Sequence, residues 1–147
     1  MSDLFDIAGK VALITGSGQG LGYTLAEGLA KAGCRIILND IDPKRLEMAV
    51  NRLSAGGHEV LSAAFDVSDE GQVRAEIDSL KGSVNSIDIL VNNAGIQIRG
   101  MLEEFDTADW DLMMNVNLKG AFVVAKVVGK GMIERQAGKI INICSIQ

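Results

Sequence analysis

Short apolar runs alternate along the chain with segments whose apolar residues recur three or four positions apart. Residues 11–15 form an aliphatic run that ends in a glycine-rich turn, which is typical of a buried strand. From 21 to 32 the apolar residues Leu21, Leu25, Leu29 and Ala32 form a helical stripe, and Gly33 ends it. The same alternation predicts strands at 35–39, 59–65, 87–91 and 139–144, and helices at 43–55, 69–80 and 108–134.

Capping residues mark three of the predicted helix starts. Asp42 precedes Pro43, so the aspartate can cap the second helix and the proline suits its first position. Ser68 is the candidate cap of the third helix, and Thr107 is the candidate start of the long fourth helix.

Strands that alternate with helices imply β-α-β units and a parallel sheet covered by helices on both faces. Right-handed crossovers bring the carboxyl ends of the strands to one edge, where ligands of such sheets bind. The predicted fold class is therefore α/β, with three layers and a doubly wound parallel sheet that is truncated after its fifth strand. Residues 1–147 are expected to form one incomplete domain.

Composition narrows the class of protein. Hydrophobic residues make up 48% of the chain and aromatic residues only 4%, which suits an aliphatic α/β core rather than a β-sandwich or a disordered chain. A net charge of −5 without a basic cluster argues against nucleic acid and anionic membranes as partners. We find no signal-peptide pattern and no apolar run near the ~18 residues of a membrane span, so a soluble cytoplasmic protein is expected.

Cysteine and histidine give no sign of a metal site. Cys34 and Cys144 are the only cysteines, and both lie in apolar runs. Two buried free thiols are expected rather than a disulfide or a metal site. The single histidine, His58, follows two glycines and has no clustered partners, so no metal is expected there either.

The segment Thr15-Gly-Ser-Gly-Gln-Gly-Leu-Gly22 joins the first strand to the first helix. Gly16 would permit the tight turn, Gly20 would let the backbone approach a diphosphate, and Gly22 would let the helix pack closely on the sheet. The N–H groups and the positive dipole at the helix N-terminus favour phosphate there. A glycine-rich turn without a ligand is the alternative, but the position between a buried strand and an amphipathic helix favours a Rossmann-type dinucleotide site. The predicted cofactor-binding residues here are Gly16, Ser17, Gln19, Gly20, Leu21 and Gly22.

Asp40 ends the second predicted strand, 18 residues after Gly22. A carboxylate about 20 residues beyond such a loop hydrogen-bonds the adenosine ribose hydroxyls. This carboxylate would repel a 2′-phosphate, and Ile41 rather than an arginine follows it. NAD is therefore favoured, with NADP possible; the alternative is that Asp40 only caps a turn with Asp42.

Four motifs, in order along the chain, resemble those of the short-chain dehydrogenases/reductases. They are T-G-x-x-x-G-x-G at 15–22, Asn92-Asn93-Ala94-Gly95, Asn115-Val-Asn-Leu-Lys-Gly120 and Ile140-Ile-Asn-Ile-Cys-Ser145. Within that family, residues 4–10, 95–97 and 141–147 are similar to gluconate 5-dehydrogenases. The resemblance implies a Rossmann-type NAD(P)-binding domain and hydride transfer to or from a sugar acid such as gluconate or 5-ketogluconate.

The resemblance also implies roles for residues that follow the third and fourth strands. Asp66, followed by Val67, matches the position that accepts a hydrogen bond from the adenine amino group; a turn aspartate is the alternative. Asn92 matches the position that steadies the central sheet and borders the adenosine ribose. Ala94 and Gly95 would let the cofactor lie against the backbone.

Two catalytic residues are implied in the same way. Asn117 matches the asparagine that holds a water of the proton relay by perturbing its helix, whereas Asn115 is assigned to structure. Ser145 matches the serine that orients the substrate; alone it would be interpreted as a cap or turn residue. The family's acid/base tyrosine, with a lysine four residues later, has no counterpart, because Tyr23 lies in the first helix and Glu27 follows it by four. This chain is therefore expected to be inactive itself.

Further expectations concern the substrate, the assembly, the alternatives to an enzyme and the packing of the long helix. Arg99 lies where the carboxylate of a sugar acid could bind. A homodimer or homotetramer is implied for the complete enzyme, through the long helix. The alternatives to an enzyme are a dinucleotide-binding module and a non-functional truncated chain. Candidate packing residues are Trp110, Met113 and Met114, and candidate assembly residues are Val123, Val124, Val127 and Val128.

Overall fold

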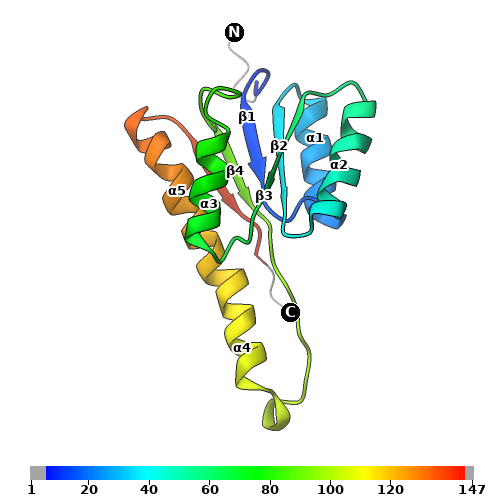
Figure 1. Cartoon of the computed structure of the whole chain (residues 1–147), viewed down its shortest axis with the longest axis vertical. Coiled ribbons are helices and arrows are strands. Elements are labelled where there is room, and N and C mark those ends of the chain that lie inside the picture. The colour runs from blue at the N-terminus through cyan, green and yellow to red at the C-terminus, as the bar shows by residue number, and fades with distance from the viewer. Residues whose placement is uncertain (1–5, 145–147) are drawn as a thin grey trace.

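In the part of the chain that the structure describes, five parallel strands form one sheet in the order β3-β2-β1-β4-β5 (Figure 1). The computed structural model describes residues 6–144. The strands are β1 (Val11–Ile14), β2 (Arg35–Asp40), β3 (Val60–Ala64), β4 (Ile89–Asn92) and β5 (Lys139–Asn142). The α-helices are α1 (Gly20–Lys31), α2 (Pro43–Ala55), α3 (Glu70–Ser79), α4 (Thr107–Met114) and α5 (Ala121–Glu134).

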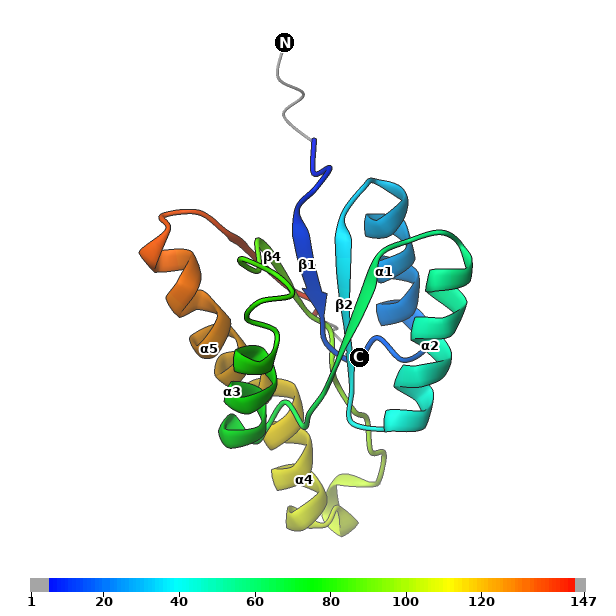
Figure 2. The same ribbon diagram turned by 45° about the horizontal axis from the view of Figure 1, so that its top comes forward.

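Helices cover both faces of the sheet, so the predicted three-layer α/β class is confirmed. Leu13, Ile37 and Leu90 pack with residues of α3 and α5 in one cluster. Their neighbours along the strands, such as Ala12 and Ile36, pack with α1 and α2 in a second cluster. Figure 2 shows these two helix pairs on opposite sides of β1 and β2. Because successive strand residues face opposite layers, the central strands are apolar throughout.

Aspartates cap the helices that follow β2 and β3 and the helix that begins at Thr107. Asp42 caps α2 as expected. The predicted cap Ser68 is wrong, because Asp69 accepts hydrogen bonds from two N–H groups of the first turn of α3, at 2.9 and 3.1 Å. Asp106, the residue before Thr107, caps α4 in the same way. A carboxylate next to the serine or threonine accepts the first-turn N–H groups in its place.

The predicted long helix is continuous in space but has three parts. A π-helical segment, η2 (Asn115–Gly120), joins α4 to α5, and a short 3-10 turn, η1 (Leu102–Glu104), precedes them. The helical stretch Thr107–Glu134 has 28 residues and is apolar enough to cross a membrane by length and composition. The expectation that the chain has no such stretch was therefore wrong. One helix of this kind is weak evidence for a span, and its buried valines belong to the core described above.

Several side-chain placements differ from the expectation. In α1 the buried residues include Tyr23 and Ala26, whereas Leu21 is exposed, because the helix turns a different stripe to the sheet. Cys34 is buried as predicted, but Cys144 is exposed beyond the end of the edge strand β5. Trp110 and Met114 are exposed, not packed. The valines assigned to assembly lie in or against the core instead: Val123, Val124 and Val128 are buried, and Val127 packs on them.

Candidate functional site

The loop between β1 and α1 lies directly against the segment that follows β4. Gly16 has φ +61, and a Cβ there would lie 2.8 Å from the Cα of Ala94. At Gly22 a Cβ would meet the carbonyl oxygen of Gly16 and, at 2.5 Å, the Nδ2 of Asn93. Gly22 therefore lets the first turn of α1 pack against the loop itself. The prediction had the helix pack on the sheet instead.

The N-terminus of α1 is open to an anion. Its N-cap residue, Gln19, makes no side-chain cap hydrogen bond. The aspartate-capped helices α2, α3 and α4 differ in this respect, since their first-turn N–H groups are occupied. Open N–H groups and the partial positive charge of a helix N-terminus attract phosphate.

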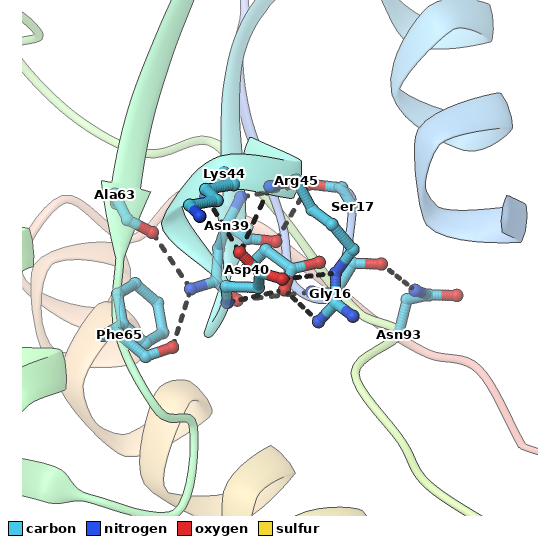
Figure 3. Close-up of polar contacts among 10 residues, drawn as sticks. Gly16, Ser17, Asn39, Asp40, Lys44, Arg45, Ala63, Phe65 and Asn93 are labelled. Carbon is cyan, nitrogen blue, oxygen red and sulfur yellow. Dashed lines mark hydrogen bonds and ion pairs between the residues drawn. The ribbon is translucent and has the colours of Figure 1, made fainter. Parts of the chain in front are cut away.

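Ser17 and Asn39 hold this loop in place from within the protein (Figure 3). The Ser17 hydroxyl, fully buried, donates to the carbonyl oxygen of Ile14 at 2.8 Å and accepts from the Asn39 N–H at 3.0 Å. The Asn39 amide accepts from the Gly16 N–H at 3.2 Å and donates to carbonyl oxygens of Ala63 and of the residue after the end of β3. Ser17 therefore anchors the loop to the ends of β1 and β2, and so does Asn39, which was not among the predicted site residues.

Thr15 and Asn93 connect the ends of β1 and β4. Asn93 Nδ2 donates to the carbonyl oxygens of Thr15, at 3.0 Å, and Gly16, at 3.1 Å. In return the Thr15 hydroxyl accepts from the N–H groups of Asn93 and Ala94, both at 3.0 Å. Neither residue was predicted for the site, although both adjoin predicted positions at strand ends.

Asn92 and Asn93 face different surroundings. The buried Asn92 donates from Nδ2 to the side chain of Asn142 at 2.9 Å and to the carbonyl oxygen of Ala121 at 3.2 Å. It therefore ties β4 to β5 and α5. Asn93, and not Asn92, lines the cavity beside the loop.

A cavity of about 230 Å³ lies between the β1–α1 loop and the residues that follow β2, β3 and β4. It brings together seven of the predicted cofactor-binding residues from four separate segments. The other five, Ser17, Gly20, Leu21, Gly22 and Asn92, are not among its lining residues, and neither is the proposed catalytic Asn117. The predicted residues that line it are Gly16, Gln19, Asp40, Asp66, Val67, Ala94 and Gly95.

Asp40 carries an ion pair that the sequence analysis did not foresee. Its buried carboxylate accepts through Oδ1 from the guanidinium of Arg45 at 2.8 Å and from the N–H of Asp42 at 2.9 Å. The hydrogen bond and the charge of Asp40 raise the pKa of Arg45. The residue directly after the strand is Ile41, but the first turn of α2 brings Arg45 back to the strand end.

Asp66 lines the cavity and also closes its own turn. Its Oδ1 accepts from both the N–H and the hydroxyl of Ser68, each at 2.8 Å. The turn interpretation and the cavity position are therefore both found in the structure. Val67 beside it is buried and would clash with a Cβ on Gly120 of the π-helical segment.

Asn117 lies in the π-helical segment and clamps the chain after Gly95. Its Oδ1 accepts from the N–H of Ile96 at 2.8 Å, and its Nδ2 donates to the carbonyl oxygen of the same residue at 2.9 Å. A helix perturbed at this position is what the resemblance implied. The other proposed catalytic residue, Ser145, lies outside the described residues.

The remaining candidates lie away from this cavity. Tyr23 is buried in α1, with the guanidinium of Arg52 4.6 Å above its ring. Arg99 is exposed, and its guanidinium donates to Gln97 at 3.3 Å. Among residues 6–144, no group of three or more His, Cys, Asp or Glu could hold a metal ion.

Comparison with known proteins decides the family. The family model described as short chain dehydrogenase matches residues 10–147. The chain belongs to the short-chain dehydrogenase family. It is 46% identical, over all 147 residues, to the 5-keto-D-gluconate 5-reductase of Escherichia coli K12 and covers 58% of that protein. It is 43% identical to the gluconate 5-dehydrogenase of Gluconobacter oxydans, with 99% of this chain and 57% of the relative covered.

Solved structures of family members have the same fold. A gluconate 5-dehydrogenase from Burkholderia cenocepacia, in complex with NADP and tartrate, superposes with a TM-score of 0.90 at 50% identity. The match covers 96% of this chain and 55% of that one. The L-sorbose reductase of Gluconobacter frateurii, complexed with NADPH and L-sorbose, gives 0.88 at 38% identity over 95% of this chain and 54% of that one. The chain thus spans a little over half the length of its relatives.

Proposed function

We propose that this chain is the coenzyme-binding part of an oxidoreductase that transfers hydride between a nicotinamide dinucleotide and a sugar acid such as gluconate or 5-ketogluconate. The cavity that adjoins the uncapped N-terminus of α1 carries this proposal, because it joins an anion site to the carboxylate and guanidinium of Asp40 and Arg45. The relatives named above support the substrate class.

The residues present fit a dinucleotide. The amides of 16–22 would hold the diphosphate, and Asp40 with Arg45 would meet the adenosine ribose. Asp66 would accept from the adenine amino group, and the backbone of Ala94 and Gly95 would lie against the coenzyme. When bound, the coenzyme supplies or accepts the hydride. Asn117 and Ser145 are the proposed catalytic residues: Asn117 would hold a water of the proton relay, and Ser145 would orient the substrate. Asn117 also positions the segment after Gly95.

We further propose that NADP is preferred to NAD, which reverses the expectation drawn from Ile41. Arg45 neutralises the carboxylate that was expected to repel a 2′-phosphate. Complexes of two relatives with NADP or NADPH support the same preference.

For the substrate contact, the assembly and the compartment, we propose what the sequence led us to expect. Arg99 is the proposed partner of the sugar-acid carboxylate, and the cytoplasm is the proposed compartment. A homodimer or homotetramer is proposed for the complete enzyme. The exposed apolar residues of the long helix that support assembly are Leu118, Phe122 and Ile133.

Titration of the purified chain with NADPH and with NADH, followed by calorimetry, tests this function. We expect saturable binding of both, tighter for NADPH, and no oxidation of gluconate by the 147-residue chain, since its one tyrosine is buried in α1. Absence of binding by a folded sample would contradict the proposal. Turnover by the purified chain would contradict the expectation that it is inactive.

A dinucleotide-binding module that works with a second polypeptide is the other candidate function. The four residues of β5 are all exposed at the edge of the sheet. Edge strands with open backbone groups pair readily with other chains. Coenzyme binding without turnover, together with turnover on addition of the remaining part of a family member, would favour this candidate.

A further inference from the structure

A second concavity lies beside α4, away from the coenzyme cavity. The segment between β4 and α4 extends together with α4 beyond the carboxyl ends of the strands (Figure 1). Between this segment and the first turns of α4 is a hollow of about 480 Å³, which we call the aromatic hollow. None of its lining residues also lines the coenzyme cavity. Its apolar wall consists of Ile98, Leu102, Phe105, Trp110 and Met113.

Local contacts fix the shape of the aromatic hollow. The half-buried Met113 accepts a hydrogen bond through Sδ from the N–H of Ile98, at 3.3 Å. A Cβ on Gly100 would lie 2.9 Å from Cδ2 of Phe105, so the backbone there lies directly against the ring. Asp106 caps α4 immediately after this ring. Because the walls are already ordered, a ligand would bind without the cost of ordering them.

The wall exposes large apolar side chains at the surface. Trp110 is 55% exposed and Leu102 is 92% exposed. Contiguous exposed apolar groups mark binding sites, whereas single scattered ones do not. The volume lies within the range of small-molecule pockets, about 300–1,000 Å³, which are lined mainly by apolar and aromatic side chains with a few polar groups. The aromatic hollow therefore suits the carbon body of a small ligand.

The charge of the hollow selects the other end of such a ligand. Arg99 is the only charged residue among its lining residues in the described part of the chain. Its guanidinium is exposed, and its one hydrogen bond within residues 6–144 goes to the neutral side chain of Gln97, at 3.3 Å. A guanidinium presents five donors in a planar fork that matches a carboxylate. A cation beside an aromatic wall therefore favours a ligand that is apolar at one end and anionic at the other.

We infer that the aromatic hollow binds a small apolar carboxylate, with the carboxylate on Arg99 and an aryl or branched alkyl body against Trp110 and Phe105. The hollow is separate from the coenzyme cavity, so this inference goes beyond the proposed function. One consequence alone rests on that function. An apolar acid would occupy the guanidinium proposed for the sugar-acid carboxylate, and it would compete with the substrate in the complete enzyme.

Trp110 is the only tryptophan of the chain, so its fluorescence reports directly on the aromatic hollow. We expect phenylacetate to change this fluorescence saturably. The neutral analogue phenylacetamide should bind about tenfold more weakly, the loss of one charge-assisted hydrogen bond. Gluconate should also bind more weakly than phenylacetate, because its hydroxyl groups would lose water against the apolar wall.

Two variants separate the role of Arg99 from a general effect of charge. Arg99→Gln should bind phenylacetate and phenylacetamide with equal affinity, since the charge that distinguishes them is gone. Arg99 is exposed, so this change leaves the packed core intact. Lys119→Gln is the matched control: it removes an exposed charge from the same helical stretch, but Lys119 does not line the hollow, so the preference for the acid should stay.

The outcomes decide the inference on its own. Preference of the wild type for the acid, lost in Arg99→Gln and kept in Lys119→Gln, supports it. It is overturned by a folded wild type that shows no saturable change, by equal affinity for acid and amide, or by gluconate binding as tight as that of phenylacetate. A fluorescence change that depends on protein concentration without ligand, with a dimer mass in sedimentation, would overturn it too, because a second copy would then cover the hollow. Titration of the same samples with NADPH tests the proposed function separately, since the two sites share no lining residue.

Discussion

Two glycines of α1 differ in how closely they are packed. Gly22 is buried where the helix begins, and a Cβ there would strike the loop at Gly16 and Asn93. Gly28 is exposed six positions later on the same helix, and a Cβ there would meet nothing within 4 Å. Close contacts therefore require glycine at position 22, whereas no contact requires it at position 28.

The variants Gly22→Ala and Gly28→Ala should shift stability in opposite directions. We expect Gly22→Ala to lower the free energy of unfolding by about 1–3 kcal/mol, because a tightly packed site must move to admit the methyl group. Gly28→Ala should raise it by about 0.5–1 kcal/mol, since alanine restricts the unfolded chain and favours the helix. Urea unfolding followed by circular dichroism measures both, and a stabilised Gly22→Ala would refute the close approach.

Single residues of the site were predictable where a local rule places them. The glycine loop and Asp40 follow from spacing along the chain, and both lie at the cavity. Thr15, Asn39 and Arg45 were missed because their roles depend on which strand ends are neighbours in space. Arg45 follows Asp40 by five residues in the sequence. Their side chains come within 2.8 Å of each other because α2 begins soon after β2 ends.

At the scale of elements, capping aspartates tie helix stability to pH. The N–H groups of the first turn of α3, Gln72 foremost, lower the pKa of Asp69 below its ordinary value. The ionised cap therefore stabilises the fold at pH values above the pKa of an aspartate in the unfolded chain, near 3.9. This contribution is lost as the pH falls through the lower pKa of the folded state.

The variant Asp69→Asn should flatten part of this pH dependence. Asparagine caps a helix about as well as aspartate but does not titrate. We expect a Tm close to wild type at pH 7 and a smaller fall in Tm as the pH drops below about 4, the ordinary range of an aspartate pKa. Parallel Tm curves for the two proteins in calorimetric scans would show that the cap contributes nothing to acid unfolding.

The π-helical segment is the element that periodicity did not predict. Its residues continue the helical pattern, so composition gives no sign of the wider turn. Contacts explain it better: Asn117 reaches Ile96, and Gly120 packs on Val67. Both contacts join segments far apart in sequence, which is why only the resemblance, and not the pattern, pointed to a perturbed helix.

Removal of the Asn117 clamp should loosen the segment after Gly95. Asn117→Ala loses two hydrogen bonds to Ile96, and we expect a loss of about 1–2 kcal/mol in unfolding free energy. The Ile96 amide should exchange with solvent faster than in the wild type. The exposed Asn115 at the start of the same segment supplies the control, since Asn115→Ala should leave Ile96 exchange unchanged. Unchanged Ile96 protection in Asn117→Ala would contradict the clamp.

At the scale of the whole molecule, the order of strands creates the site. β1 lies between β2 and β4, so the loop after β1 has the ends of both neighbours beside it. The alternation of elements predicted this edge correctly, because parallel strands deliver their carboxyl ends together. The long helix was expected to supply the assembly residues, but the residues were misassigned: the valines fill the core, and Phe122 with Leu118 faces outward.

In the proposed function, the amides of the β1–α1 loop and the end of β2 bind a nicotinamide dinucleotide. Backbone amide NMR of the ¹⁵N-labelled chain during titration with NADP tests this most directly. We expect saturable shifts concentrated at 16–22, at Asp40 and Arg45, and at Ala94 and Gly95. Shifts centred elsewhere, as in the hollow between α3 and α5, or no saturable shifts in a folded sample, would contradict it.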